Sequence, residues 1–201
     1  MSRLWPILFS ICFFSACVSN PEVEILNDNQ LMLSYEDLEL VFNKDQGGSI
    51  GRTNFKESTV FNSCQDHFPS VENSYRQNST SIVHDSESVF ARTDHEKLNI
   101  NRSIILKDSI LELNWKIKNS RKSNIKGIFE LEIELAKKSK LKTFKNGAQL
   151  FLNNGSTIEI ISDNKLSFKI TDQTLLIFDS YPRIIKPLHR SSQKITFKFL
   201  D

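Results

Sequence analysis

Apolar and polar residues alternate strictly in the middle of the chain. In residues 109–118, the apolar side chains from Leu111 to Ile117 alternate with polar ones, and in residues 129–135 they alternate with three glutamates. A period of two places one set of side chains on one face of a strand. Both segments are therefore predicted to be half-buried strands. As neighbours, they would set lysines opposite glutamates.

Short strands are predicted along most of the chain. Further apolar runs, bounded by Asn, Asp, Ser and Gly, lie at residues 30–34, 38–42, 49–55, 98–106, 148–152, 157–162, 165–170, 174–178 and 194–200. Turn signals at this spacing are typical of antiparallel sheets, and no window has the period of an amphipathic helix. The sequence predicts a single all-β domain over residues 30–201, an antiparallel β-sandwich.

Residues 56–81 interrupt this pattern. They are rich in Asn, Ser, Gln and Asp, with few apolar side chains, and predict a long loop. Binding residues lie disproportionately on loops that a rigid scaffold holds in place. We therefore expect this segment to carry function.

The N-terminal residues have a different character. Arg3 precedes an apolar run from Leu4 to Phe14, and two small residues then precede Cys17. The run is shorter than the roughly 20 residues that span a bilayer as a helix. It is typical of a cleaved signal peptide, residues 1–16. A short polar tether would follow at residues 17–29, and it would continue into a first strand near residues 23–26.

Phe14-Ser15-Ala16-Cys17 resembles the lipobox of bacterial lipoproteins. The resemblance implies a diacylglycerol on the Cys17 sulfur and an acyl chain, such as palmitate, on its new amino group. More than one chain gives stable membrane attachment. Val18 in place of an aspartate implies the outer membrane, by the sorting rule of such lipoproteins. The alternative is an ordinary signal peptide cut nearby, which would leave a soluble periplasmic protein.

Cysteine usage agrees with export. Cys12 would leave with the signal peptide and Cys17 would carry lipid, so the mature domain, with Cys64, cannot form an internal disulfide. Its stability must come from a hydrophobic core.

Charge differs between the two halves of the chain. Residues 22–115 hold 8 Lys and Arg against 16 Asp and Glu, whereas residues 116–198 hold 17 against 7. We expect the halves to neutralise each other within one sandwich; a basic face toward anionic lipid or polysaccharide is the alternative. The lysine-rich residues 137–145 predict a solvated loop or an edge strand, with contact to an anionic membrane as the alternative. Nucleic acid is not an expected partner of an exported protein.

Two further runs carry a second resemblance. The run from Leu38 to Gly51, with its Gly-Gly turn, and the run from Leu111 to Asn119 resemble the opening and middle of galactose mutarotase-like domains. The resemblance implies a β-supersandwich. In the aldose epimerases of that family it also implies a His general acid, in a His-Pro context, and a Glu general base.

No catalytic residue can be assigned from that resemblance, because no histidine here precedes proline. His67, His84 and His95 each adjoin a carboxylate and are the candidates for acid–base chemistry. Their spacing, with Cys64 and Asp66, matches no recognised zinc pattern. We predict no metal site and no cofactor.

Carbohydrate binding is the expected function. Sugar sites combine an aromatic platform with a polar rim, which makes Tyr75 with Arg76, and Tyr181 with Arg183, the candidate ligand-binding residues. We expect a non-catalytic, lipid-anchored module that binds an envelope or environmental glycan. Two alternatives remain: an aldose epimerase-like enzyme, and an assembly lipoprotein that binds an envelope protein complex.

Overall fold

The computed structural model describes residues 20–46, 49–68, 80–85, 88–95 and 98–200. Nearly all of this part of the chain lies in strands, apart from one 3-10 turn, η1 (Lys44–Gln46). Within these ranges, no helix has the length and apolar character needed to cross a bilayer.

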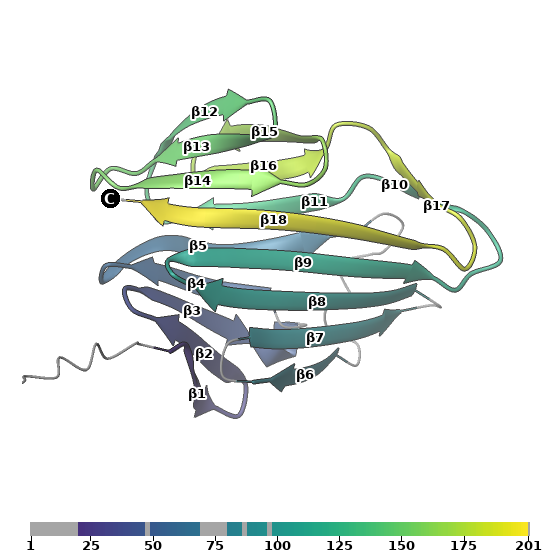
Figure 1. The fold of residues 1–201 in the computed structure, drawn as a ribbon, viewed down its shortest axis with the longest axis horizontal. Coiled ribbons are helices and arrows are strands. Elements are labelled where there is room, and N and C mark those ends of the chain that lie inside the picture. Colours follow the sequence, from purple (N-terminus) through teal and green to yellow (C-terminus); the bar gives the residue numbers. More distant parts are fainter. Residues whose placement is uncertain (1–19, 47–48, 69–79, 86–87, 96–97, 201) are drawn as a thin grey trace, which may run out of the picture.

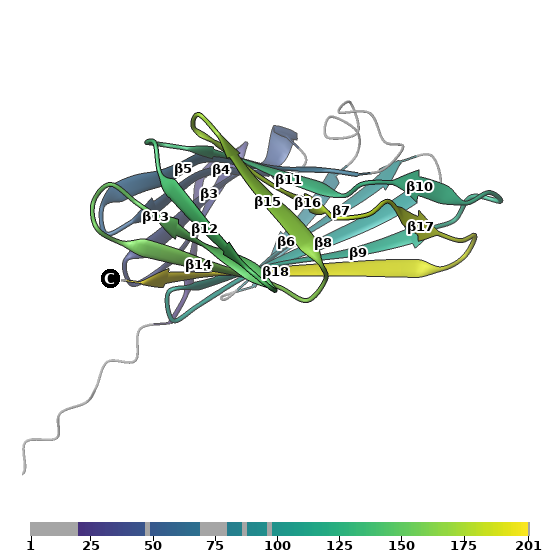
Figure 2. The same cartoon turned by 90° about the horizontal axis from the view of Figure 1, so that it is seen from above.

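Two eight-stranded antiparallel sheets form the two layers of a sandwich (Figures 1 and 2). The first sheet contains, in spatial order, β1 (Glu22–Asn27), β2 (Gln30–Tyr35), β3 (Leu38–Asn43), β4 (Ser49–Phe55), β5 (Ser58–His67), β11 (Glu130–Leu135), β16 (Thr174–Asp179) and β15 (Leu166–Thr171). The second contains β12 (Lys140–Phe144), β13 (Gly147–Phe151), β14 (Thr157–Ser162), β18 (Arg190–Leu200), β9 (Ile110–Asn119), β8 (Leu98–Lys107), β7 (Ser88–His95) and β6 (Thr80–His84). A two-stranded ribbon, β10 (Ile125–Gly127) and β17 (Arg183–Ile185), lies at the end opposite the C-terminus (Figure 1). The predicted all-β sandwich is confirmed.

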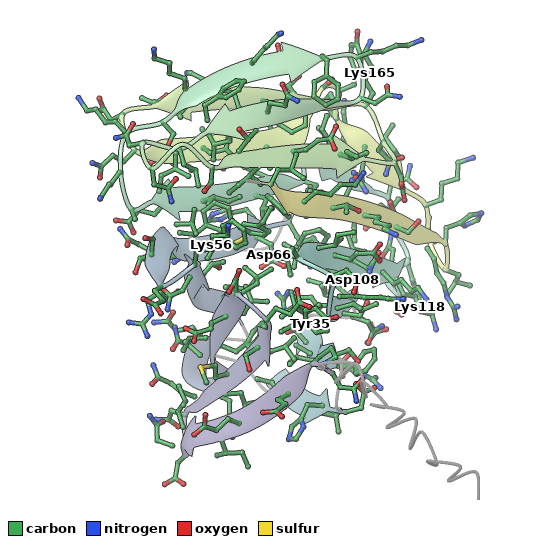
Figure 3. All side chains as sticks on the ribbon, turned by 60° about the vertical axis from the view of Figure 1, so that its left-hand side comes forward. Tyr35, Lys56, Asp66, Asp108, Lys118 and Lys165 are labelled. Carbon is green, nitrogen blue, oxygen red and sulfur yellow. The ribbon has the colours of Figure 1, made fainter. Side chains whose placement is uncertain are left out.

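The core lies between the two layers. Phe61 of β5 contacts Phe197 and Phe199 of β18, with ring centroids 6.0 and 6.2 Å apart, so aromatic contacts join the sheets. The layers are also tied near one end, where the Tyr35 hydroxyl of β2 donates to Asp108 Oδ1 in the β8–β9 turn at 3.0 Å (Figure 3). Burial of apolar side chains from both inner faces is the main stabilising term of such a sandwich.

The predicted long loop at residues 56–81 is wrong over its first part, where Ser58–His67 is strand β5. The turn before it holds Lys56 and Glu57, both with positive φ (49° and 59°). A two-residue hairpin turn of this kind usually contains Asn or Gly, so its signal is absent from the sequence. The polar residues of β5 other than the buried Asp66 occupy exposed or half-buried positions, and for that reason the segment resembles a loop.

Residues 109–118 and 129–135 form strands as predicted, but the two strands are not neighbours. Strand β9 lies in the second sheet and β11 in the first. The glutamates of β11 therefore do not face the lysines of β9. By contrast, β12, within the lysine-rich run, is an edge strand as predicted. Strand β1 begins at Glu22, inside the segment assigned to the tether.

The acidic and basic halves of the chain lie side by side within each sheet, and they meet where β5 pairs with β11 and where β18 pairs with β9. Each half supplies strands to both sheets. Lys194 of β18 forms an ion pair with Glu112 of β9, with Nζ 2.8 Å from Oε1. Opposite charges from the two halves thus meet across neighbouring strands.

Candidate functional site

The outer face of the first sheet carries a group of polar side chains around one aromatic residue. Residues directly opposite each other on neighbouring strands share a face, so the register of β5, β11, β16 and β15 defines three rows. These rows, which we call the glutamate face, are His67–Glu130–Phe178–Ser167, Gln65–Glu132–Leu176–Lys169 and Ser63–Glu134–Thr174–Thr171.

Alternation along β11 explains why the glutamates point outward. Leu131 and Ile133 are fully buried (1% and 0% exposed) between the sheets, so the residues on either side of each must face the other way. Glu130 and Glu132 are nonetheless half-buried, as is Phe178 beside them on β16. The face is therefore partly shielded from solvent, which strengthens polar contacts made there.

A hollow of about 500 Å³ lies over one end of this face. The side chains that line it and bear on ligand binding are Gln65, Glu132, Glu134, Lys138, Asp172 and Thr174. The volume is within the range of small-molecule sites, and the lining offers carboxylate and amide oxygens to hydroxyl donors.

His67 and two glutamates meet at the other end of the face. His67 Nε2 lies 3.4 Å from Glu132 Oε2, and ligand atoms of His67, Glu130 and Glu132 all lie within 4.8 Å of one another. An imidazole beside carboxylates is capable of proton transfer or of metal binding. The other two candidate histidines are on the second sheet, His84 at the end of β6 and His95 at the end of β7, and are not brought to this group.

Asp66, next to His67 in sequence, points the opposite way, into the sandwich (Figure 3). Its Oδ2 accepts hydrogen bonds from Arg102 Nε at 2.5 Å and from Trp115 Nε1 at 2.6 Å, and Arg102 Nη1 donates to Thr93 Oγ1 at 3.1 Å. This network joins β5 to β7, β8 and β9 across the core. The cavity beside it has about 20 Å³ of room, enough for about one water and far too little for a sugar.

Tyr181 and Arg183 were predicted together as ligand-binding residues, but Tyr181 lies at the surface and Arg183 is largely buried. Tyr181, just after β16, is 70% exposed, with Lys165 Nζ 5.5 Å from its ring centre. Its neighbour Ser180 contacts Ser167, a member of the glutamate face, with the hydroxyl oxygens 2.9 Å apart. Tyr181 therefore lies near the Phe178 end of that face.

Arg183 is largely buried, and its donors are bound within the protein. It pairs with Asp179, and it donates to Ser191 Oγ and to Gln193 Oε1 at 3.0 Å each. Asp179 also accepts the backbone N–H of Phe129 at 2.9 Å. This network holds β17 against β16 and β18. Tyr75, Arg76 and Cys17 lie outside the described residues.

Sequence reasoning missed the glutamate face. The alternation of Glu130, Glu132 and Glu134 with buried residues was visible, but it indicated only the solvent side of a strand. Their placement beside His67 and Phe178 depends on β11 inserting between β5 and β16. Those pairings join segments far apart in the chain.

Comparison with known proteins supports the fold. No family model and no curated protein sequence matches the chain. Among solved structures, it resembles a putative aldose 1-epimerase from Escherichia coli (8% identity, TM-score 0.68, 90% of this chain and 99% of that one). It also resembles a galactose mutarotase-like protein from Lactobacillus casei (6% identity, TM-score 0.65, 85% and 99%) and a galactose mutarotase related enzyme from Lactobacillus acidophilus (10% identity, TM-score 0.58, 86% and 97%). The chain thus has the β-sandwich fold of galactose mutarotase-like proteins. At these identities the likeness concerns the fold alone.

Proposed function

We propose that this protein is a lipid-anchored carbohydrate-binding protein of the bacterial cell envelope, and that the glutamate face binds the sugar. The observation that carries the proposal is the position of Phe178. This half-buried ring lies in a row with Glu130 and His67, next to the row of Gln65 and Glu132. An apolar ring face bordered by hydrogen-bonding groups matches the two surfaces of a sugar.

The negative charge of the glutamate face determines which classes of sugar it can bind. Glu130, Glu132 and Glu134 lie on it with one lysine, Lys169, and the hollow adds Asp172 and Lys138. Carboxylates accept hydrogen bonds from hydroxyl and ammonium groups and repel anions. The ligand is therefore a neutral or amino sugar and not an acidic polysaccharide.

The envelope location rests on the N-terminal sequence. Lipid on Cys17 would hold the domain close to its membrane, because only a few residues separate Cys17 from β1 at Glu22. The glycan would then be one that lies near that membrane. An envelope protein complex is the alternative partner, and stable co-purification after mild detergent extraction would support it.

The test is a glycan array probed with the full chain in mild detergent. We expect signals on neutral or amino sugars that Phe178→Ala abolishes. Phe151→Ala is the matched control, since Phe151 is an exposed phenylalanine (40%) on β13 of the second sheet. Equal signals from both variants, or no signal from the native chain, would overturn the proposal.

A sugar epimerase is a second candidate, favoured by the imidazole and carboxylates on one open polar face. The proximity of His67 and Glu132 does not favour the epimerase function. An acid and a base that act across one anomeric centre must each reach a different atom of the sugar, with the sugar between them. His67 and Glu132 lie side by side on the face, with 3.4 Å between Nε2 and Oε2.

A further inference from the structure

The sheet register holds an imidazole and two carboxylates at one point. His67, the last residue of β5, lies directly opposite Glu130, the first residue of β11, and Glu132 follows on the same face. Both strands are internal to the first sheet, paired on each side. The backbone positions of the three side chains are therefore fixed by ladder hydrogen bonds, and little ordering is needed to bring their ligand atoms within 4.8 Å.

No lysine or arginine in the described part of the chain neutralises the two carboxylates. Among the described residues, neither Glu130 nor Glu132 forms an ion pair with a lysine or arginine; His67 is the partner of Glu132. Like charges on neighbouring positions of a sheet face repel each other, and the half-buried setting reduces screening by water. A cation seated between the three groups would remove this repulsion.

From this arrangement we infer a binding site for a divalent transition-metal ion, of which Zn²⁺ is the best match, with His67, Glu130 and Glu132 as its three protein ligands. One nitrogen and two carboxylate oxygens suit Zn²⁺, whereas Mg²⁺ and Ca²⁺ prefer all-oxygen sites with more ligands. Three protein ligands leave a coordination position for water or for another oxygen donor. The site lies at one end of the glutamate face, but the inference does not depend on sugar binding there.

The experiment titrates ZnCl₂ into the full chain, held in mild detergent and first stripped with a chelator, by isothermal calorimetry. We expect one ion per chain from ZnCl₂ and no comparable binding from MgCl₂. Because loss of even an indirect partner of a metal ligand weakens metal binding about 10- to 100-fold, His67→Ala and Glu132→Gln should each weaken it at least tenfold.

His189→Ala is the matched control, since His189 is an exposed histidine outside the first sheet, and it should bind as the native chain does. Glu132→Gln preserves side-chain shape, so it tests the site even if His67→Ala lowers stability; circular dichroism checks the fold of each variant.

Absorption bands of Co²⁺, added in place of Zn²⁺, should appear with the native chain and vanish with Glu132→Gln. No binding of Zn²⁺, or equal loss in the His67 and His189 variants, would overturn the site. Neither result bears on the glycan array, which uses no added metal.

Discussion

Asp66 of the first sheet and Arg102 of the second form an ion pair inside the sandwich, with side chains 7% and 6% exposed. The pair sits between Trp115, which donates to Asp66, and Phe68, whose ring centre is 5.9 Å from the Arg102 guanidinium carbon. Because both charges are removed from water, each depends on the other for compensation.

Asp66→Asn should therefore destabilise the fold strongly. The amide keeps the shape of the carboxyl but leaves the Arg102 charge buried without its counter-ion, which costs about 3–5 kcal/mol of unfolding free energy. Urea denaturation followed by tryptophan fluorescence measures it. Asp94→Asn is the control: Asp94 pairs with Arg92 on the surface, with side chains 48% and 60% exposed, and its loss should cost under about 1 kcal/mol. Equal losses in the two variants would contradict the assignment.

Asp179→Ala should also lower the unfolding free energy, by about 3 kcal/mol, because it removes the partner of Arg183 and the acceptor of the Phe129 N–H. The same denaturation experiment measures this change. Asp163→Ala, at an exposed position, should change stability little. A stable Asp179 variant would mean that the Arg183 network is not structural.

Tyr181→Ala should weaken glycan binding without abolishing it. The ring is exposed near the Phe178 end of the glutamate face, so it would add stacking at the rim, where its loss is worth about threefold in affinity. Titration calorimetry with the best glycan from the array measures the change. If the Tyr181→Ala variant binds the glycan with unchanged affinity, the binding site includes only residues of the glutamate face and not Tyr181.

The intact protein should not catalyse mutarotation. We expect polarimetry with glucose or galactose to give the rate seen in buffer alone, since His67 and Glu132 contact each other instead of flanking a sugar-sized space. Turnover that disappears in a folded His67→Ala variant would instead establish the epimerase function.

Cys17→Ser should move the protein from the membrane fraction to the soluble fraction, because serine cannot form the thioether through which we propose that Cys17 carries a diacylglycerol. Mass spectrometry of the N-terminal peptide should show acyl chains on the native chain and none on the variant. Cys12→Ser is the control, since Cys12 lies within the predicted signal peptide. A native peptide with an unmodified Cys17 inside it would refute the anchor.

The sequence by itself determined the strands with a clear period of two. Strands β9 and β11 follow directly from alternation, because the face that a side chain occupies is a local property of an extended backbone. The same property made the burial of Trp115 (3% exposed) predictable. Strand β5 was not predicted, because the turn before it lacks the usual Asn or Gly and because most of its outward residues are polar.

The candidate site was decided by the tertiary structure alone. Which sheet a strand joins depends on pairings between distant segments, such as β5 with β11, and a period of two carries no information about them. His67 and Asp66 are neighbours in sequence, yet alternation sends one to the glutamate face and the other into the core. The candidate site brings His67 together with Glu130, Glu132 and Phe178 only because β11 lies between β5 and β16.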